Sequence, residues 1–347
     1  MRYQNFSERT LRLHEAAQEG GWELHNAASP EYLPIWIATH PQPEYSRSRI
    51  AWAMMHGNEP TGFEALVQFI RRGAPAFNWT LVPMVNPTGI DAFSRLTVEG
   101  VDLNRCARQA GPVESDVLKL ILQSSRYELA LNLHDQRSIF HPAGIYMPSS
   151  LSILAPAAMK GSVAVQPDRA VAWAGSLSLW MRERRPDWGY ARFDESYYPT
   201  AFGEWVQELA IPTVTVETGV ALGDASRAEV GQALFEVLCR TDAHLSPDEQ
   251  GRAHYFNLPY NASDGCDFEL KSGTQSSYWK LWEVVQDGGY VSGIERVESA
   301  EDLCPYQCIE VAHVDFNLLT QRPIWTTAEL YATATSSLRD LAEVLPR

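Results

Sequence analysis

The apolar run Ile50-Ala-Trp-Ala-Met-Met55 leads directly into His56-Gly57-Asn58-Glu59, and this junction decides how the rest of the chain is interpreted. An uncharged apolar run of this length, bounded by polar residues, is typical of a buried strand. Two further strand-like runs end in the same way: Glu128–Leu133 is followed by His134, and Thr213–Val216 is followed by Glu217. Because open α/β sheets bind ligands at the carboxyl ends of their strands, we expect these three ends to meet at one edge of a sheet.

Helical patterns alternate with the strand-like runs over roughly the first 245 residues. One helix begins near Pro60, ends at Gly73 and carries the apolar residues Phe63, Leu66, Val67 and Ile70 on one face. Further helices are expected at Glu114–Arg126 and Arg227–Ala243, and further strands at Leu33–Thr39 and Trp79–Val85. This alternation predicts an α/β fold with a mixed, largely parallel central sheet and helices on both faces.

The chain changes in character near Leu245. The stretch LSPDEQGRAH (245–254) is polar and turn-prone, and the residues after it are richer in Gly, Asp, Ser and aromatic side chains. We therefore expect a catalytic domain over residues 1–248 and a smaller, β-rich unit over residues 249–347. A helix around Ala328–Val344 is expected to close the second unit.

Composition excludes several classes of function. The sequence has 347 residues, with 28 Lys and Arg against 43 Asp and Glu, and its formal net charge is −15. So acidic a chain is poorly suited to bind nucleic acid or an anionic membrane surface. No apolar run approaches the roughly 18 residues of a transmembrane helix, and the first residues contain no secretory apolar segment. With five irregularly spaced cysteines, the expectation is a cytoplasmic protein whose oligomeric state the sequence leaves open.

The residues at the three strand ends form a ligand set that suits Zn²⁺. Two imidazoles and one carboxylate can hold this ion and leave a fourth tetrahedral position for water. The sequence therefore predicts a zinc site made of His56, Glu59 and His134, with Glu217 accepting a proton from water. Each residue alone also has an ordinary explanation, as a chance His-x-x-Glu pair, a core histidine or a helix cap. The joint site is favoured because an ionisable group after an apolar strand is costly to bury unpaired.

A further motif, Gly100-Val101-Asp102-Leu103-Asn104-Arg105, follows Asn86-Pro87-Thr88-Gly89. Asn104 and Arg105 offer an amide and a forked guanidinium side by side, which suits a substrate carboxylate. Asp102 could accept the second ring N–H of a zinc-bound histidine and so fix its tautomer. The alternative is an ordinary surface loop whose arginine pairs with acidic groups nearby.

The motifs HGNE (56–59), NPTG (86–89), GVDLNR (100–105), NLH (132–134) and VETG (216–219) occur in this order along the chain. In this order they resemble the zinc carboxypeptidase (M14-like) superfamily, which includes the carboxypeptidases and the aspartoacylase/succinylglutamate desuccinylase branch. The resemblance covers about residues 50–220 and implies a zinc carboxypeptidase-like fold. The last part of the chain, about 100 residues, carries no motif that resembles a known family.

The resemblance implies that His56, Glu59 and His134 bind one zinc ion per chain and that Glu217 is the general base. It also implies roles for residues around them: Asn104 and Arg105 hold the substrate carboxylate, Asp102 supports His56, and Arg95 stabilises the oxyanion. Tyr197 and Tyr198 both stand where the family keeps a tyrosine that closes over the substrate, and the choice between them stays open. Asp135, directly after His134, departs from the family pattern and could bind a substrate ammonium or raise the basicity of the site.

Two interpretations share this chemistry, a zinc-dependent hydrolysis of an amide bond next to a free carboxylate. A metallocarboxypeptidase would release the C-terminal amino acid of a peptide, and this is the interpretation we favour. An N-acyl amino acid deacylase of the aspartoacylase/succinylglutamate desuccinylase type would hold the carboxylate of its amino acid with the same residues. A third hypothesis is a zinc-containing binding protein that recognises chain ends without cutting them.

Overall fold

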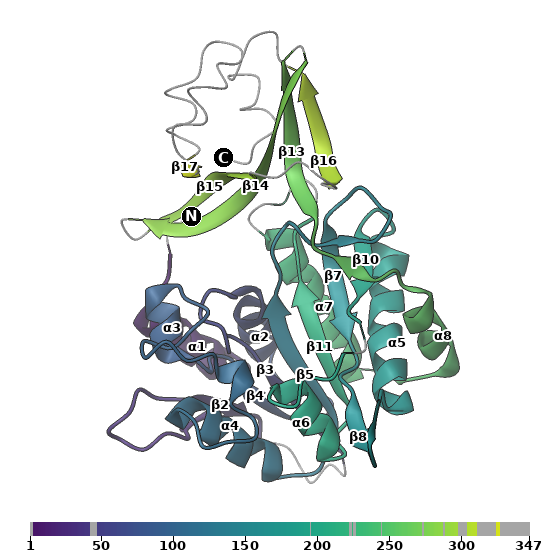
Figure 1. Ribbon diagram of the computed structural model, residues 1–347. Coiled ribbons are helices and arrows are strands. Elements are labelled where there is room, and N and C mark those ends of the chain that lie inside the picture. The colour runs from purple at the N-terminus through teal and green to yellow at the C-terminus, as the bar shows by residue number, and fades with distance from the viewer. Residues whose placement is uncertain are drawn as a thin grey trace.

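An eight-stranded sheet with the order β1-β2-β4-β3-β5-β11-β7-β10 lies at the centre of the first part of the chain (Figure 1). The computed structural model describes residues 3–41, 47–194, 196–221, 224, 227–243, 245–272, 274–286, 289–297, 304–310 and 324–326. The strands of this sheet are β1 (Glu23–Asn26), β2 (Trp36–Thr39), β3 (Ser48–Trp52), β4 (Asn78–Val82), β5 (Tyr127–Asp135), β7 (Ser149–Leu154), β10 (Gly189–Arg192) and β11 (Thr213–Thr218).

The middle of the sheet is parallel. Strands β4, β3, β5 and β11 run in the same direction, whereas β2 is antiparallel to β4 and β7 is antiparallel to β11. At the two edges β1 is antiparallel to β2, and β10 is parallel to β7. The predicted α/β class with a mixed, largely parallel sheet is confirmed. The three strands that end in candidate site residues, β3, β5 and β11, are direct neighbours and deliver those residues to the same edge.

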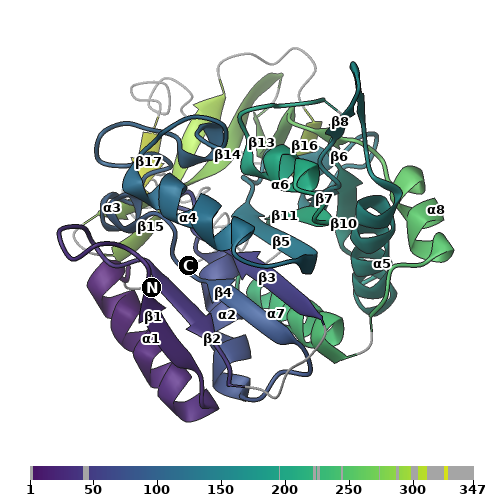
Figure 2. The ribbon, with the colours of Figure 1, turned by 90° about the horizontal axis from the view of Figure 1, so that it is seen from below.

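Helices cover both faces of this sheet (Figure 2). They are α1 (Phe6–Gly20), α2 (Thr61–Arg72), α3 (Pro87–Ala92), η1 (Leu103–Arg105), α4 (Val113–Gln123), α5 (Asp168–Arg184), α6 (Phe202–Glu208), α7 (Ala228–Ala243) and α8 (Glu249–Asn257). One apolar cluster joins the sheet to α1, α2, α5, α7 and α8, and a second joins the opposite face to α4 and α6. Along β5, Leu129, Leu131 and Leu133 point into the first cluster and Ala130 points into the second. Burial on both faces explains why the central strands are continuous apolar runs.

The helices expected from the sequence are present with shifted ends. Helix α2 begins at Thr61 and stops before Gly73, whose positive φ of 94° a residue with a side chain rarely adopts. Helices α4 and α7 correspond to the other two expected helices. The closing helix expected around Ala328–Val344 lies outside the described residues. None of the helices in the described ranges is long and apolar enough to cross a membrane.

A second, five-stranded sheet with the order β16-β13-β14-β15-β17 stands above the carboxyl edge of the first sheet in Figure 1. Its strands are β13 (Gly265–Ser272), β14 (Gln275–Gln286), β15 (Gly289–Val297), β16 (Cys304–Glu310) and β17 (Ile324–Thr326), and the shorter strands β6 (His141–Pro142), β8 (Ala158–Lys160), β9 (Val163–Val165) and β12 (Asn261–Ala262) form two small ladders. Strand β12 pairs with β6, so the chain leading into the second sheet is hydrogen-bonded to the loop that follows β5. The division into domains at residue 248 stays a prediction.

Candidate metal centre and catalytic site

The connection from β3 to α2 holds His56 and Glu59 in a fixed loop. Asn86 binds this loop twice, since its N–H donates to Met54 O at 3.0 Å and its Nδ2 donates to Met55 O at 3.3 Å. Gly57 packs so closely that a Cβ atom there would lie 1.9 Å from the backbone carbon of Gly89. The NPTG segment (86–89) therefore shapes the loop that carries His56 and Glu59. The sequence analysis had assigned no role to this motif.

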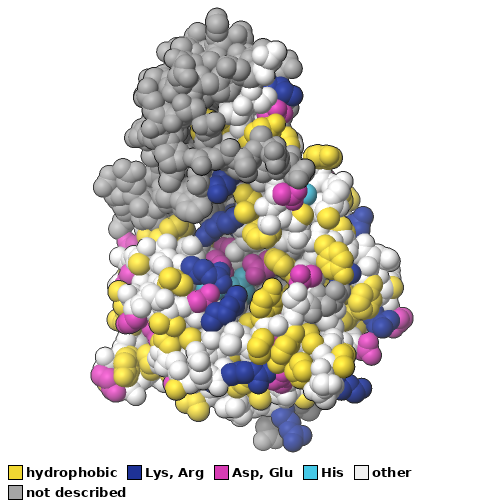
Figure 3. Space-filling view, viewed as in Figure 1, with side chains coloured by type: hydrophobic (Ala, Val, Ile, Leu, Met, Phe, Trp, Pro, Cys, Tyr) yellow, Lys and Arg dark blue, Asp and Glu magenta, His cyan; other side chains and the backbone are white. Residues whose placement is uncertain are grey.

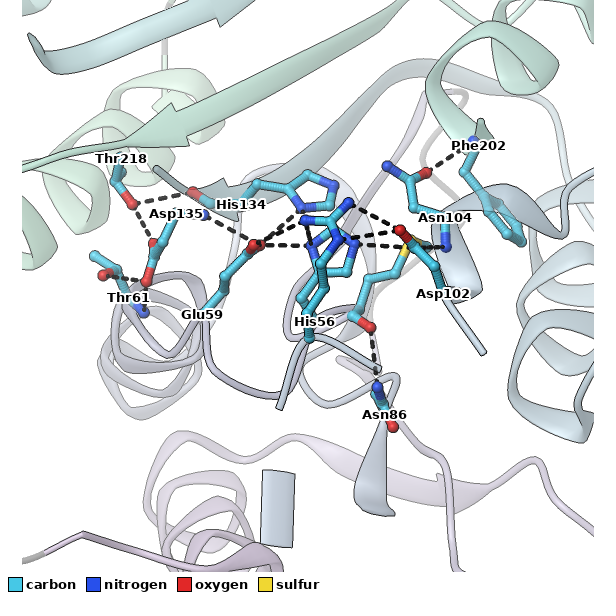
Figure 4. A network of polar contacts seen from close by, with 12 residues as sticks. His56, Glu59, Thr61, Asn86, Asp102, Asn104, His134, Asp135, Phe202 and Thr218 are labelled. Atoms are coloured by element: carbon cyan, nitrogen blue, oxygen red, sulfur yellow. Dashed lines mark hydrogen bonds and ion pairs between the residues drawn. The ribbon is translucent and has the colours of Figure 1, made fainter. Parts of the chain in front are cut away.

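His56, Glu59 and His134 converge on one point, with the Glu59 carboxylate facing both imidazole rings (Figure 4). Glu59 Oε1 lies 2.8 Å from His56 Nδ1, and Glu59 Oε2 lies 2.9 Å from His134 Nδ1. The two Nδ1 atoms are 3.2 Å apart. All three side chains are buried, and each offers a ligand atom within 4.8 Å of the others. The structure thus brings the three predicted ligands together, His56 and Glu59 from the connection between β3 and α2 and His134 from β5.

The donor set fits a divalent metal ion. Three atoms with free electron pairs face one another in a buried space, where only a proton or a cation can offset their mutual repulsion. Two imidazole nitrogens and a carboxylate are a common ligand set for Zn²⁺ that leaves a position open for water. Glu59 touches both rings and would therefore neutralise part of the charge of such an ion.

Asp102 lies on the other side of His56. Its Oδ1 lies 3.2 Å from His56 Nε2 and can accept a hydrogen bond from a proton on that nitrogen, an arrangement that would leave Nδ1 available to a cation. Asp102 also accepts a hydrogen bond from Asn104 N at 2.9 Å and pairs with Arg95 at 3.0 Å. The Arg95 guanidinium reaches within 3.3 Å of His56 Nδ1 and 3.7 Å of Glu59 Oε1. Arg95 is therefore beside the predicted ligands, at the open side of the site.

Contacts among His56, Glu59 and Asp102 shift the pKa values of these three side chains. Burial opposes ionisation of Glu59, yet the neighbouring His56 and His134 outweigh it and hold the pKa of Glu59 well below its usual value. Burial also opposes protonation of His56, but Glu59 and Asp102 together raise its pKa. His56 and Arg95 likewise overcome burial and hold the pKa of Asp102 below its usual value. The cluster therefore keeps the carboxylates of the buried Glu59 and the partly buried Asp102 charged, which is the electrostatic setting that a cation stabilises.

Glu217 stands directly opposite His134 on the neighbouring parallel strand β11. Although its side chain keeps some contact with solvent, burial of the carboxyl group raises the pKa of Glu217 to about 7. The negative charges of Glu59 and Asp135 raise it further, whereas His134 and Arg95 lower it. A carboxyl group with a pKa near 7 can both accept and return a proton under neutral conditions.

Asp135 is directed away from the ligand cluster (Figure 4). One carboxylate oxygen accepts hydrogen bonds from Thr61 N at 3.1 Å and Thr61 Oγ1 at 2.8 Å, and the other accepts one from Thr218 Oγ1. Asp135 thereby caps the first turn of α2 and joins β5 to β11. Burial raises its pKa. Since both oxygens are engaged with the protein, this arrangement fits a positioning role better than the capture of a substrate ammonium.

Asn104 and Arg105 lie beside the first turn of α6. Asn104 Oδ1 accepts a hydrogen bond from Phe202 N at 3.0 Å, which anchors its amide. The Arg105 guanidinium is exposed and lies 5.9 Å from the ring centroid of Tyr198. Tyr197 is held elsewhere, since its hydroxyl donates to Glu208 Oε1 at 2.6 Å and accepts from Arg108. Tyr198 is therefore the tyrosine that shares a surface with Arg105.

Figure 3 shows this region as a hollow on the surface, where histidine and acidic side chains lie next to Lys and Arg side chains. Three residues that the sequence analysis did not single out also contact residues of the candidate site. Thr61 and Thr218 bind Asp135. The buried Glu204 accepts a weak hydrogen bond from Tyr198 N at 3.4 Å. Thr218 could have been noticed from its place beside Glu217. Thr61 and Glu204 carry no local signal, because only the fold brings them to the site.

No family model matches the chain, and no curated protein matches it. Solved structures do match. A metallo-carboxypeptidase from Burkholderia cenocepacia has a TM-score of 0.52 and 13% identity, covering 67% of this chain and 68% of that one. A metallo-carboxypeptidase from Pseudomonas aeruginosa in complex with (2-guanidinoethylmercapto)succinic acid has a TM-score of 0.51 and 17% identity over 67% and 68% of the two chains. A candidate metallopeptidase from Shewanella denitrificans has a TM-score of 0.50 and 18% identity over 70% and 91%. The resemblance found in the sequence is therefore confirmed at the level of the fold, which is that of the metallo-carboxypeptidases.

Proposed function

We propose that this protein is a zinc-dependent metallocarboxypeptidase that releases a C-terminal amino acid from a peptide. The observation that carries the proposal is the convergence of His56, Glu59 and His134 on one point, with Glu217 opposite His134 on the next strand. The carboxypeptidase-like fold supports the same conclusion. Each group that the reaction needs has a residue in a suitable place.

In this proposal zinc is held by His56 Nδ1, His134 Nδ1 and the carboxylate of Glu59, the atoms that face one another. When bound, zinc polarises the carbonyl of the scissile amide and lowers the pKa of water to about 7. Asp102 keeps the proton of His56 on Nε2, so that Nδ1 presents its electron pair. Asp135 fixes the backbone next to His134 through Thr61 and Thr218.

The carboxylate of Glu217 accepts the proton of the attacking water and later gives it to the leaving nitrogen. Its raised pKa of about 7 suits both transfers at neutral pH. The guanidinium of Arg95 reaches the open side of the ligand cluster and faces the oxyanion as it develops. One such donor is typically worth about 10²–10³ in rate.

Asn104 and Arg105 bind the free carboxylate of the substrate. The amide of Asn104 is fixed by Phe202 N, and the exposed guanidinium of Arg105 is available for a bidentate contact. Tyr198, next to Arg105, closes over the bound residue in preference to Tyr197. In this proposal the amide bond next to the bound carboxylate would lie over the metal centre.

An N-acyl amino acid deacylase is the second candidate, because the chain that enters the second sheet is bonded to the loop after β5. Gly265 N donates to Ile139 O at 3.0 Å and β12 pairs with β6, which attaches this chain to the loop that follows β5, the strand that carries His134. A narrower entrance would favour a compact acylated amino acid over a peptide.

Metal analysis followed by a substrate panel tests the proposal. We expect about one zinc per chain and release of C-terminal residues from short peptides, with little hydrolysis of N-acyl amino acids. Hydrolysis of only the N-acyl amino acids would assign the deacylase function instead. Stoichiometric zinc without hydrolysis of either set would indicate a binding protein.

The substitution Glu217→Gln tests the role of the base. We expect turnover to fall by at least about 10³-fold, because a carboxamide cannot accept the proton, while bound zinc stays at the level of the unchanged protein. The matched control is Glu236→Gln. This substitution removes a carboxylate on α7 that pairs with Arg185. Full activity of the Glu217→Gln variant would overturn the assignment.

A further inference from the structure

Arg227 lies where strands β5 and β11 end, and the proposed mechanism does not use it. The residue is buried, with 7% of its surface exposed. Arg227 Nη1 donates to Thr218 O at 3.0 Å and to Gly219 O at 3.2 Å, and Arg227 Nη2 donates to Gln136 O at 2.9 Å. One guanidinium therefore binds three backbone carbonyls that come from two neighbouring strands.

These three carbonyls lie close in the sequence to two residues of the candidate site. Two of them belong to the residues directly after Glu217, and the third belongs to the second residue after His134. Glu217 and His134 are register partners in the ladder between β11 and β5, and the ladder ends with the next pair. The guanidinium thus continues the connection between the two strands past the end of their pairing.

Thr218 connects the same two strand ends through its side chain. Its Oγ1 donates to Asp135 on β5 (Figure 4) and lies 3.1 Å from His134 O. Thr218 is thus bound to β5 by its hydroxyl and to Arg227 by its carbonyl. Because Thr218 directly follows Glu217, a shift of its backbone would move the Glu217 carboxylate relative to His134.

The backbone of Arg227 adopts a conformation that residues with a side chain rarely take. Its φ is 57°, in the left-handed region, where a Cβ atom causes strain that glycine does not have. Arg227 stands directly before α7, and its carbonyl accepts from Gly231 N at 2.8 Å. Strained residues persist where surrounding contacts hold them in place. A glycine here would relieve the strain but would lose the three hydrogen bonds to the strand ends.

From these contacts we propose that Arg227 is a positioning residue for the proposed reaction. It holds the ends of β5 and β11 together and so fixes the place of the Glu217 carboxylate relative to His134. Its action is indirect, since it works through the backbone carbonyls of the two strands. The inference rests on the proposed function, because Glu217 is the base there. It holds equally for a peptide and for an N-acyl amino acid as substrate.

The forked shape of the guanidinium is the property that this role requires. Two terminal nitrogens bind three oxygens in fixed directions, whereas lysine has one nitrogen on a flexible stem. The substitution Arg227→Lys therefore keeps the positive charge but loses the link between the strands. The substitution Arg227→Met loses both. We expect the lysine variant to resemble the methionine variant rather than the unchanged protein.

Steady-state kinetics of the full-length, zinc-loaded protein test the role. Rates are expressed per bound zinc ion, with whichever substrate class the unchanged protein hydrolyses. We expect kcat to fall about 10²-fold in Arg227→Met and in Arg227→Lys, because a displaced base transfers protons poorly. We expect KM to stay within about twofold, because the residues proposed to hold the substrate are unaltered. A kcat near that of the unchanged protein in either variant, or a loss seen only in KM, would refute the inference.

Arg49 supplies a matched control at the opposite edge of the same sheet. It is a second buried arginine, on β3, and it donates to Glu128 Oε1 at 2.8 Å and to the carbonyl of Thr241. We expect Arg49→Met to lower the melting temperature at least as much as Arg227→Met does, yet to leave kcat per bound zinc within about twofold. An equal fall of kcat in both variants would show that the loss of any buried arginine impairs the enzyme, and the specific role of Arg227 would be lost.

Amide hydrogen exchange provides a readout that needs neither zinc nor turnover. In the metal-free Arg227→Lys variant we expect exchange in residues 134–138 and 217–221 to accelerate at least about tenfold, because the strand ends open locally. Residues 49–53 of the neighbouring strand should exchange at the rate of the unchanged protein. Unaltered exchange at the strand ends would show that the ladder holds them without Arg227.

This inference and the proposed function fail in distinguishable ways. Peptide hydrolysis with an unchanged kcat in Arg227→Met would retain the carboxypeptidase and remove the role of Arg227. Faster exchange in the variant, with no hydrolysis by the unchanged protein, would retain the link between β5 and β11. It would remove the carboxypeptidase and, with it, the part of Arg227 in placing a base.

Discussion

The contact between His56 and Asp102 shows how a single carboxylate can influence a proposed metal ligand. Asp102 accepts from His56 Nε2, binds Arg95 and caps the short helix η1 through Asn104 N. One side chain therefore contacts a ring nitrogen of His56, an arginine and the start of the segment that we propose to hold the substrate carboxylate. Changes at Asp102 should affect metal binding without removing a ligand.

The substitution Asp102→Asn tests this role. We expect zinc affinity to fall about 10–100-fold, because the neutral amide no longer holds the proton of His56 on Nε2. The measurement is competition with a chelator of known affinity. Asp91→Asn, which alters a carboxylate bonded to Phe6 N far from the ligands, serves as the control. Unchanged zinc affinity in the Asp102 variant would contradict the role.

Glu204 predicts a dependence of stability on pH. Burial raises its pKa from 4.5 to about 7, so between these values the folded protein binds a proton that the unfolded chain has released. The contribution of the protonated Glu204 to the free energy of unfolding is thus complete at low pH and is lost as the pH rises through 7. We expect Glu204→Gln to match the unchanged protein near pH 4.5 and to exceed its free energy of unfolding by up to about 3 kcal/mol at pH 8.

The measurement for Glu204 is denaturant unfolding at a series of pH values. The exposed Glu183→Gln on α5 is the control and should run parallel to the unchanged protein. A constant difference between the Glu204 variant and the unchanged protein at every pH would show that this carboxyl group does not titrate across that range.

At the level of elements, the site depends on loops whose backbones touch. Gly57 in the connection from β3 to α2 contacts the backbone of Gly89 at the start of α3, so the two segments fit only without a side chain between them. Glycine is required here by close approach, since the nearest atoms belong to the rigid backbone of a neighbouring element.

Two alanine substitutions separate close approach from ordinary helix propensity. Gly57→Ala should destabilise the protein by more than about 2 kcal/mol and weaken zinc binding, because its Cβ would overlap Gly89. Gly231→Ala in α7 should stabilise it by about 0.5–1 kcal/mol, since its Cβ would meet only Thr61 Cγ2 at 3.6 Å. Chemical unfolding measures both. Equal effects would show that the loop can move away from Gly89.

The burial pattern of each strand explains whether the sequence could predict it. Strands β3, β5 and β11 were predictable because burial on both faces makes them apolar runs, and their ends supplied the candidate ligands. Strand β7 was missed because Ser149, Ser150 and Ser152 are buried there, and their polarity hides a strand. Their partners, Asn261, Val220 O and Gln136, come from distant parts of the chain. Hydrogen bonds to residues far away in the sequence leave no pattern in the sequence of the strand itself.

Among the helices that the sequence analysis missed, α1 and α5 were missed for different reasons. Helix α1 carries a capping box of Asn5 and Glu8, a signal that could have revealed it. Helix α5 is buried around most of its circumference because α8 covers its outer side, where Gly175 approaches Gly251 O. A helix without a clear polar face lacks the periodicity that sequence analysis uses. The positions of Arg95 and Tyr198 could not be predicted either, because both residues lie in loops that are arranged only by the tertiary fold.

At the level of the whole molecule, the chain entering the second sheet is connected to the segment that follows His134. Asn261 Nδ2 donates to Gln136 Oε1 at 2.8 Å, and Asn261 Oδ1 accepts from Ser149 Oγ at 2.9 Å. His141 and Asp264 pair at 2.8 Å, and Ser138 binds Asp267 at 2.7 Å. The second sheet is therefore attached to the loop after β5 by side chains as well as by the pairing of β6 with β12.

The substitution Asn261→Ala tests this attachment. We expect a loss of about 1–2 kcal/mol, because two hydrogen bonds are removed and Gln136 loses a partner. Amide hydrogen exchange should accelerate in residues 136–149 more than in α2 or α7. Asn257→Ala, at the exposed end of α8, is the control and should change neither. Unchanged exchange in the loop would show that the backbone pairing alone holds it.

The loop from Ala53 to Pro60 has a consequence for work at the bench. Asn86 and the contact with Gly89 hold this loop through protein atoms alone, and two apolar cores support the strands on either side of it. Unlike a zinc finger, whose chain collapses when the ion is stripped, this scaffold should survive dialysis against a chelator. A bound Zn²⁺ could then be exchanged for Co²⁺, whose visible absorption would show whether His56, Glu59 and His134 coordinate the ion as ligands are added.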